Sequence, residues 1–368
     1  MKNNLEVLKK IISSSKFKKI LVITGKKSYT LSGAKKLIEP ILIKSNYSFF
    51  YKKNYFPSIS ELREIILEIK RFKPNLILAI GGGCVLDYAK ISNFLTFSKN
   101  LENEIKKGSY LSNNKYCYLM AIPTTAGSGA EVTSNAVIYI NNQKYSVEDP
   151  KIKPDNFFLL PSLILKNNKR LKNSAGFDAV AQAVESLFSV KSNSASLVFA
   201  KKSLELSFKN FIPYVNNPNK YNSINMLLAS NLAGKAISIS KTTLPHALSY
   251  PFSSHFNLSH GHAVSITFNN CLKFNYINLH KSHANFDLFK RFEILFKLTN
   301  TNNIEELDNF FLTLKKGSGL ITNYKKLKIN IKNESDRILS EVNQQRLKNN
   351  PVKISNKNLK SILINQSE

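Results

Sequence analysis

The six histidines of this chain all lie between residues 246 and 283, and this clustering is the first sign of chemistry. His246 and His260 stand 14 residues apart. The segment 176–186 has the pattern of a helix, and its Asp178 and Gln182 are four residues apart, on one helix face. Imidazole and carboxylate groups gathered in this way are typical ligands of divalent metals. A single histidine is more often a packed or surface residue, so only the cluster as a whole indicates a metal site.

Three consecutive glycines, Gly81, Gly82 and Gly83, follow a short apolar run and precede an amphipathic stretch that contains Asp87. Glycines at such a junction let backbone N–H groups approach a phosphate, and the start of the following helix carries partial positive charge. A plain tight turn is the other interpretation. We predict a pyrophosphate cradle, although its form, Gly-Gly-Gly-x-x-x-Asp, differs from the usual Gly-x-Gly-x-x-Gly fingerprint.

A second loop, between residues 122 and 133, combines glycines with hydroxyl side chains. Thr124, Thr125 and Ser128 follow an apolar run that is typical of a strand. Small polar residues at a strand end can reach the phosphates or ribose of a nucleotide without steric obstruction. Taken alone, the segment is also compatible with an ordinary Ser/Gly loop.

Two kinds of pattern divide the chain. Between residues 18 and 165, short apolar runs at 20–23 and 76–80 flank a stretch at 58–72 with apolar residues at helical spacing, which indicates a β-α-β unit on a parallel sheet. After about residue 171 the pattern becomes helical throughout, with helices expected at 177–190, 194–211 and 223–239. We therefore predict an α/β dinucleotide-binding domain with a parallel sheet at 1–165. An all-α domain that binds metal and substrate is predicted at 166–368, with the ligands between the two halves.

The composition excludes several classes of protein. Hydrophobic residues make up 43% of the 368, which is enough for a sizeable core, and no apolar run approaches the length of a membrane span. The first 20 residues lack the apolar segment of a secretory signal, so we expect a cytoplasmic protein that does not contact a membrane. The three cysteines are widely spaced, which predicts neither disulfides nor a structural zinc site.

The formal net charge of +29 raises nucleic acid as a partner. However, 47 of the 53 basic residues are lysines spread along the chain, only 6 are arginines, and no nucleic-acid-binding motif is present. We therefore expect no nucleic-acid partner. The charge is better suited to a small anionic substrate.

In their order and spacing, these segments resemble the iron-containing (group III) alcohol dehydrogenase family, and the resemblance continues to the stretch 346–351. The resemblance implies the two-domain architecture shared with dehydroquinate synthase, commonly in a homodimer. It also implies a divalent metal, usually iron or zinc, and hydride transfer between a nicotinamide and an alcohol or aldehyde carbon.

The resemblance assigns nucleotide binding to the loop 81–83, Asp87, Thr124, Thr125 and Ser128, and it adds Lys144 beside the nicotinamide ribose. At Gly25, NAD-specific members of the family often carry an aspartate that holds the ribose 2′-hydroxyl. The segment 25–28, Gly-Lys-Lys-Ser, lacks that anion and adds cations. We therefore expect NADPH to be favoured over NADH.

The metal ligands implied by the resemblance are Asp178, Gln182, His246 and His260. Gln182 replaces a histidine of the family, which leaves two oxygen and two nitrogen donors. This set favours Fe²⁺, with Zn²⁺ also compatible. Loss of the metal is the alternative.

Two residues are candidates for proton transfer. Tyr250 stands where many relatives carry a histidine, and His262 follows the second metal histidine closely. A phenol at position 250 can relay a proton, but it can equally well serve only in packing.

The predicted substrate site supplies cations and donors beside the metal, from Lys241, Thr242, Thr243 and His255. These residues, together with Gln182 and Tyr250, resemble the branch of the family that reduces phosphonoacetaldehyde to 2-hydroxyethylphosphonate. The alternatives are a reductase of another short aldehyde or semialdehyde, and a cyclase similar to dehydroquinate synthase that uses NAD catalytically.

Overall fold

The computed structural model describes residues 4–14, 16–110, 114–141 and 143–364. The chain forms two compact units. Unit 1 comprises Met1–Thr125 and Gly129–Asn167, and unit 2 comprises Ala126–Ser128 and Asn168–Glu368. The dinucleotide-binding and metal-binding roles assigned to residues 1–165 and 166–368 stay predictions.

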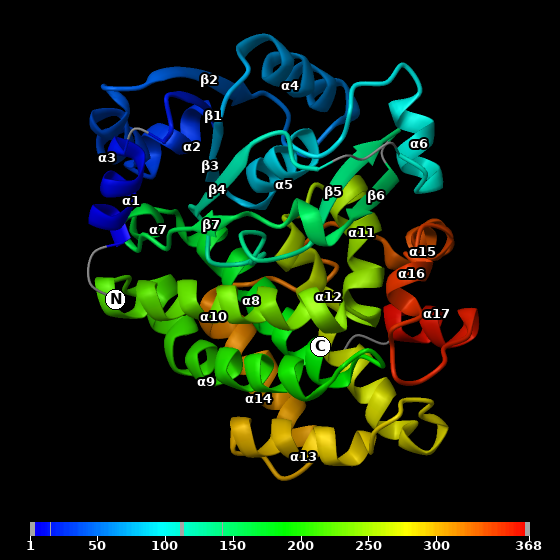
Figure 1. Cartoon of the computed structure of the whole chain (residues 1–368). Helices are drawn as coiled ribbons and strands as arrows, with labels where there is room; N and C mark the ends of the chain where they lie inside the picture. The colour runs from blue at the N-terminus through cyan, green and yellow to red at the C-terminus, as the bar shows by residue number, and fades with distance from the viewer. Residues whose placement is uncertain (1–3, 15, 111–113, 142, 365–368) are drawn as a thin grey trace. The chain divides into compact units, whose positions relative to one another are not determined.

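Unit 1 is built on a parallel sheet with the strand order β2-β1-β3-β4-β7 (Figure 1). Its strands are β1 (Lys19–Gly25), β2 (Asn46–Lys52), β3 (Leu76–Gly81), β4 (Tyr118–Pro123) and β7 (Asn156–Phe157). The central strands β1 and β3 are buried over almost their whole length, as expected for strands covered on both faces. The strands predicted at 20–23 and 76–80, and the parallel sheet, are confirmed.

Alternate residues of the strands enter two separate apolar cores. One face packs against α1 (Asn4–Ser13), α2 (Lys26–Leu31), α3 (Ala34–Leu42) and the single turn α7 (Ser162–Leu165). The other face packs against α4 (Ile59–Phe72), α5 (Gly83–Ser92), α6 (Leu101–Lys107) and a hairpin of β5 (Asn135–Ile140) and β6 (Gln143–Glu148). Each fully buried aliphatic side chain contributes about 1.5–3 kcal/mol to these cores. A short 3₁₀ turn, Pro150–Ile152, precedes β7.

The helix predicted at 58–72 is confirmed as α4. Ser58 is its N-cap, with the side-chain oxygen accepting a hydrogen bond from the backbone N–H of Glu61 at 3.4 Å. The sequence patterns did not identify the β5–β6 hairpin. In β5 the outward, partly buried residues Val137 and Tyr139 are apolar like the inward ones, so the sequence does not alternate between apolar and polar residues. In β6 only Val147 is buried, which leaves little pattern to detect.

Unit 2 is helical over the residues that the structure describes, which confirms the predicted all-α half. Its helices are α8 (Lys169–Phe188), α9 (Ser194–Asn216), α10 (Lys220–Ser240), α11 (Leu244–Phe256), α12 (His260–Ile277), α13 (Leu288–Thr299), α14 (Ile304–Ser318), α15 (Ile331–Ser340), α16 (Gln344–Leu347) and α17 (Asn356–Ile364), with a 3₁₀ turn at Leu279–Lys281. The helix α8 begins earlier than predicted because the side chain of Asn168 caps it by accepting from the N–H of Leu171.

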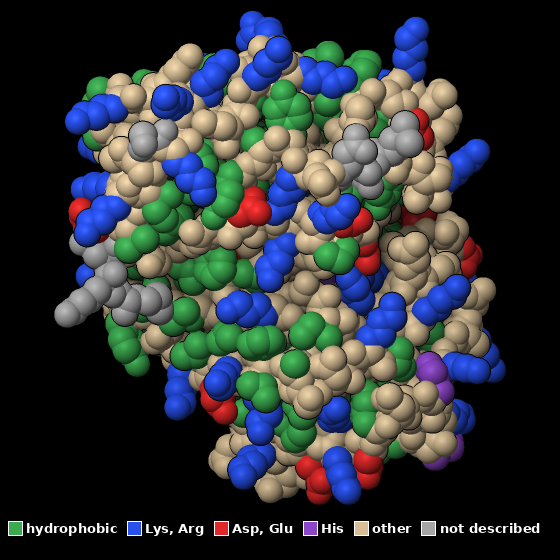
Figure 2. Space-filling view, in the orientation of Figure 1, with side chains coloured by type: hydrophobic (Ala, Val, Ile, Leu, Met, Phe, Trp, Pro, Cys, Tyr) green, Lys and Arg blue, Asp and Glu red, His purple; other side chains and the backbone are tan. Residues whose placement is uncertain are grey.

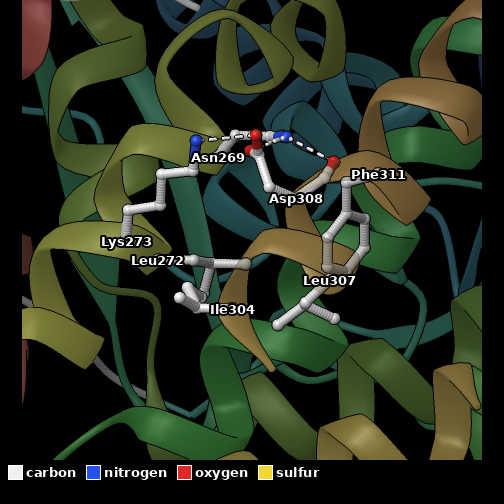
Figure 3. A pocket seen from close by; sticks show the side chains of 7 residues that line it. All are labelled: Asn269, Leu272, Lys273, Ile304, Leu307, Asp308 and Phe311. Atoms are coloured by element: carbon white, nitrogen blue, oxygen red, sulfur yellow. Dashed lines mark hydrogen bonds and ion pairs between the residues drawn. The ribbon is translucent and has the colours of Figure 1, made fainter. Parts of the chain in front are cut away.

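The helices of unit 2 pack closely, as the contact between α12 and α14 illustrates. There, Asp308 accepts a hydrogen bond from the Asn269 side chain at 2.7 Å and pairs with Lys273 at 2.7 Å (Figure 3). The recess between Leu272, Phe311 and their neighbours is too narrow to admit a water molecule. It is therefore a packing defect of the helix contact, with no room for a ligand.

On the face shown in Figure 2, the charged side chains are dispersed: Lys and Arg lie among polar and apolar side chains, with Asp and Glu between them. Among the described residues, no helix has the length and apolar character needed to cross a bilayer.

Lys90 is a fully buried cation on α5. Its ammonium donates hydrogen bonds to the hydroxyl of Thr133 and the carbonyl of Asn135, both at 2.7 Å, and lies 3.8 Å from the Asp87 carboxylate. Burial lowers the pKa of Lys90 to about 8, although the charges of Asp87 and Glu131 oppose the shift. The side chain therefore fixes α5 to the start of β5.

This buried lysine predicts a pH dependence of stability. Between about pH 8 and pH 10 the unfolded chain retains the Lys90 proton while the folded protein releases it, so stability rises with pH by up to about 1.4 kcal/mol per unit from this group. In Lys90→Met we expect that part of the slope to vanish, measured by denaturant unfolding at several pH values. The exposed Lys99→Met should keep the wild-type slope. An unchanged slope in Lys90→Met would contradict the assignment.

Candidate functional site

The glycine loop of unit 1 connects β3 to α5 with little space for side chains. A Cβ at Gly81 would lie 2.5 Å from the Val85 side chain, and one at Gly82 would lie 3.4 Å from the Thr125 side chain. The backbone N–H of Thr124 donates to the carbonyl of Gly81 at 3.0 Å. The loop and two of the predicted nucleotide residues, Thr124 and Thr125, therefore lie together at the carboxyl end of the sheet, where ligands of open α/β sheets bind.

Asp87 is held one turn into α5 by the hairpin beside it. Its carboxylate accepts a hydrogen bond from the backbone N–H of Val137 at 3.2 Å. Burial raises the pKa of Asp87, and the nearby charges of Lys90 and Lys144 act in the opposite direction. The predicted residues Asp87 and Lys144 are thus close enough to interact, and the previously unassigned hairpin brings Lys144 to this site.

Cys84, in the first turn of α5, is partly buried. Burial raises the pKa of its thiol to about 12, with the positive charge of Lys52 opposing the shift. This shift disfavours the thiolate, as expected of a side chain that serves in packing. All three cysteines are free.

Ser128 belongs to unit 2, together with Ala126 and Gly127. A Cβ at Gly127 would lie 2.8 Å from the carbonyl oxygen of Ala175 at the start of α8. This close contact fixes the loop against the helix. The assignment of Ser128 to nucleotide binding stays a prediction.

Asp178, His246 and His260 form a compact cluster of ligand-type atoms in unit 2. One atom from each residue lies within 4.8 Å of the others. The Nε2 atom of His246 is 3.3 Å from the Asp178 carboxylate, and that of His260 is 3.9 Å from it. The structure therefore brings together three of the four predicted metal ligands from α8, α11 and α12.

Gln182 completes this arrangement. Its side-chain nitrogen donates to Asp178 at 3.1 Å, and its side-chain oxygen is buried without a hydrogen-bond partner among the described residues. A buried carbonyl oxygen without a partner is costly, and coordination of a cation would satisfy it. The set of two oxygens and two imidazole nitrogens therefore fits a divalent metal of the Fe²⁺ or Zn²⁺ type.

Glu185 supports this cluster and was missed by the sequence analysis. Its buried carboxylate accepts hydrogen bonds from His246 Nδ1 and from the backbone N–H and hydroxyl of Thr243, the latter two at 2.8 and 3.0 Å. A carboxylate that holds Nδ1–H directs Nε2 toward a metal. Its sequence signal was its spacing, since it follows Asp178 by seven residues and Gln182 by three on one helix face.

The carboxylates around His246 favour a positive charge in this pocket. Burial lowers the pKa of His246, but the carboxylates of Glu185 and Asp178 outweigh it and raise the pKa to about 10. A bound metal ion would take over the role of the proton on Nε2.

Gly261 allows α12 to lie directly against α8. A Cβ at this position would be 2.0 Å from the Ser174 carbonyl oxygen and 2.8 Å from the Asp178 Cβ. Only glycine fits there, and its neighbour His260 is thereby held beside Asp178. This one small residue sets the distance between the second imidazole and the carboxylate.

The two candidates for proton transfer are placed differently. The ring of Tyr250 lies 6.3 Å from that of His260, centroid to centroid. His262 Nε2 donates to the carbonyl of Ile321 at 2.6 Å, while burial and the charge of Arg170 lower its pKa. The proton on His262 Nε2 is therefore engaged in a structural hydrogen bond.

The predicted substrate residues are only partly brought together. Thr243 donates its hydroxyl to Glu185, so it supports the metal cluster and is not free to bind substrate. His255 pairs with Glu341 at 2.7 Å and with Arg337 at 2.6 Å. It lies nine residues beyond His246 on α11, about 13 Å along the helix, so the structure does not bring it to the cluster.

Lys241 and Thr242 remain as candidates for substrate binding. Lys241, just after α10, has φ 62° and ψ 172°, a region that is essentially reserved for glycine. The backbone is fixed on both sides of it, because Ser189 donates to the Ser240 carbonyl and Asn349 donates to the Thr242 carbonyl at 3.0 Å.

Two family models match this chain. The model "Iron-containing alcohol dehydrogenase" matches residues 1–161, and the model "Fe-containing alcohol dehydrogenase family, C-terminal" matches residues 172–366. The chain belongs to the iron-containing alcohol dehydrogenase family.

The individual curated relatives share only about a quarter of their aligned residues with this chain. The chain is 26% identical over 218 residues to phosphonoacetaldehyde reductase of Streptomyces viridochromogenes, covering 57% of this chain and 55% of that one. It is 25% identical over 272 residues to aldehyde-alcohol dehydrogenase 2 of Entamoeba histolytica, covering 70% of this chain and 31% of the relative. The chain thus spans about half or less of the length of these curated relatives.

A solved structure matches more completely. Sulfoacetaldehyde reductase from Bifidobacterium kashiwanohense, in complex with NAD⁺, superimposes with a TM-score of 0.84 at 25% identity, covering 98% of this chain and 94% of that one. The predicted fold class, an α/β domain with a parallel sheet followed by a helical domain, is confirmed.

The contacts of Glu185 predict its effect on metal binding. Glu185→Gln keeps the size of the side chain but removes the charge that holds His246 Nδ1–H, so we expect metal affinity to fall about 10- to 100-fold. Competition with a metal chelator measures this, and the exposed Glu205→Gln serves as the control. Equal metal affinity in the wild type and Glu185→Gln would contradict the supporting role.

Proposed function

We propose that the protein is a metal-dependent, NAD(P)H-linked reductase of short aldehydes that carry an anionic group. In the reverse direction the same enzyme acts as an alcohol dehydrogenase. The observation that carries this proposal is the cluster of Asp178, His246 and His260. Beside it lies the side-chain oxygen of Gln182, which has no hydrogen-bond partner in the described part of the chain. The family and the glycine loop support a nicotinamide dinucleotide as the hydride carrier.

In this proposal the four clustered side chains hold a divalent metal, which supplies a Lewis acid for the oxygen of the substrate. Glu185 keeps the His246 ring in the tautomer that presents Nε2 to the metal. The loop 81–83 and Asp87 hold the pyrophosphate and ribose of the dinucleotide, with Lys144 nearby. Positioning of this kind supplies much of the rate of a hydride transfer.

Proton delivery falls to Tyr250 in this scheme. Of the two candidates, His262 has its Nε2 proton engaged by Ile321, whereas the Tyr250 ring lies next to His260. A phenol there can give its proton to the product oxygen as negative charge develops. His262 then supports the fold of this region more than the chemistry.

Strain at Lys241 supports an anion-binding role. A non-glycine residue in this conformation costs about 1–3 kcal/mol, and such costs are concentrated at functional sites. The conformation persists because the hydrogen bonds of Ser240 and Thr242 fix the chain on both sides. A cation held in this way is suited to a phosphonate, sulfonate or carboxylate on the substrate.

Phosphonoacetaldehyde, reduced to 2-hydroxyethylphosphonate, is the substrate that we propose first. The named activities of two relatives, phosphonoacetaldehyde reductase and sulfoacetaldehyde reductase, are both reductions of a two-carbon aldehyde with an anionic group. Other short semialdehydes are the main alternative. A cyclase that uses NAD catalytically is disfavoured by the family match, and it differs in consuming no net nicotinamide.

We also propose that the protein is cytoplasmic and forms a homodimer.

The direct test is oxidation of NADPH and NADH by the Fe²⁺- or Zn²⁺-loaded protein. We expect phosphonoacetaldehyde or another anionic aldehyde to give a kcat/KM well above that of acetaldehyde, and chelation of the metal to abolish the activity. Equal rates with anionic and neutral aldehydes would contradict the anion site. Full activity after chelation would contradict the metal.

The anion site can be tested separately at Lys241. Lys241→Gly removes the cation while giving the backbone a residue that accepts φ 62°. We expect KM to rise about 10-fold or more for an anionic aldehyde and less than twofold for acetaldehyde, with a melting temperature no lower than that of the wild type. Lys241→Arg should retain the discrimination. Equal KM increases for both aldehydes would contradict the assignment.

A further inference from the structure

The carboxyl ends of β1 and β2 bring a lysine beside the glycine that replaces the usual aspartate. Gly25 and Lys52 are paired residues of the two parallel strands. A Cβ built at Gly25 would lie 2.6 Å from Oγ of Ser28 and 3.7 and 3.8 Å from Cε and Cγ of Lys52. The aliphatic part of Lys52 therefore passes directly beside the site from which an aspartate would project at position 25.

Lys52 is held in this position from its own side of the sheet. Its ammonium donates to the carbonyl of Asn54 at 2.8 Å, so two of its three donor positions remain for a ligand. The backbone of this segment is fixed by the buried carboxylate of Glu61, which accepts from the N–H groups of Lys53 and Asn54. Glu61 also accepts from the Tyr88 hydroxyl at 2.7 Å, so its own charge is well compensated.

The charge of Lys52 reaches the glycine loop. It acts on the thiol of Cys84, which follows Gly83 in the first turn of α5. Lys52 thus lies within electrostatic range of the proposed pyrophosphate cradle while its side chain lies beside Gly25. Both positions belong to the edge of unit 1 at which a dinucleotide would bind.

The sheet order assigns a role to this location. In dinucleotide-binding folds, the strand beside the glycine-loop strand carries at its end the residue that meets the adenosine ribose. An acidic residue there accepts the 2′-hydroxyl, and a cation nearby accommodates a 2′-phosphate. Here β3 carries the glycine loop, and β1 lies beside it and ends at Gly25.

Space for the adenosine end of a dinucleotide lies next to this lysine. Asn54, whose carbonyl accepts from Lys52, lines an open groove of about 340 Å³ together with Tyr55, Phe56 and Tyr139. The rings of Phe56 and Tyr139 lie 4.9 Å apart, centroid to centroid. Planar aromatic side chains offer a stacking surface for a purine base.

We propose that Lys52 selects for a 2′-phosphorylated dinucleotide by pairing its ammonium with the 2′-phosphate above Gly25. This inference rests on the proposed function, because it places the dinucleotide on unit 1. The inference goes beyond the proposed function because it assigns the discrimination between NADPH and NADH to Lys52. This residue ends β2 and lies outside the segment 25–28. Glycine at position 25 leaves no carboxylate beside Lys52 that would repel the phosphate.

The test is calorimetric binding of two fragments that differ only in the 2′-phosphate, 2′,5′-ADP and 5′-AMP, to the whole protein. We expect the wild type to bind 2′,5′-ADP about 10-fold or more tightly than 5′-AMP, which corresponds to about 1.4 kcal/mol. Lys52→Ala should lose this preference, because its Kd should rise far more for 2′,5′-ADP than for 5′-AMP. Lys52→Arg should retain it.

Lys44→Ala is the matched control, since Lys44 is an exposed lysine just before the opposite end of β2. It lowers the net charge by the same amount, so it should leave both Kd values unchanged. A general attraction of the basic chain for anions would instead affect Lys44→Ala and Lys52→Ala alike, and this result would overturn the inference.

Two further outcomes separate this inference from the proposed function. Wild-type protein that binds 5′-AMP but shows no preference for 2′,5′-ADP would overturn the role of Lys52 and leave the dinucleotide site intact. Wild-type protein that binds neither fragment would overturn both. Unfolding temperatures of the variants, measured beside the titrations, identify any loss of binding that comes from a damaged fold.

Discussion

The buried chain of contacts from Glu185 through His246 to Asp178 is the interaction on which the candidate site depends. Two carboxylates and one imidazole lie almost without solvent inside unit 2, an arrangement that is costly unless a positive charge lies between them. These two carboxylates raise the pKa of His246, and the side-chain oxygen of Gln182 has no hydrogen-bond partner among the described residues. A divalent cation bound here would balance the carboxylates and give the Gln182 oxygen a partner. The polar interior of these helices therefore favours the proposed metal site.

Packing of the helices serves this arrangement. One face of α8 supplies Asp178, Gln182 and Glu185, while α11 and α12 contribute one imidazole each. Gly261 permits the close approach of α12, and Thr243 satisfies Glu185 from the start of α11. The same packing explains the strained backbone at Lys241, because hydrogen bonds fix the chain on both sides of this residue between α10 and α11. Unit 1 is simpler, because a parallel sheet naturally gathers the loops after β1, β3 and β4 at one edge.

Much of this was predictable from patterns that have a direct physical cause. Strands such as β1 and β3 are covered on both faces and therefore appear in the sequence as uninterrupted apolar runs. Long helices such as α8 and α9 were indicated by the spacing of their apolar residues. The residues of the candidate metal site were predicted because histidines are rare in this chain. Glu185 was missed because a glutamate in a helix is ordinary, and its spacing from Asp178 gains meaning only from its contact with His246. The substrate roles expected of Thr243 and His255 could not be judged from sequence, since both depend on partners brought from distant segments, Glu185 and Glu341.

The central claim is that Asp178, Gln182, His246 and His260 hold one divalent metal. The most direct test is anomalous diffraction at the iron edge from crystals of the protein grown with Fe²⁺ and without oxygen. The account predicts a single strong peak bonded to Asp178, to Nε2 of both histidines and to the side-chain oxygen of Gln182, at about 2.0–2.2 Å. A peak bonded to other residues would contradict the account. Crystals that contain the bound nicotinamide dinucleotide but show no metal peak at this cluster would contradict it as well.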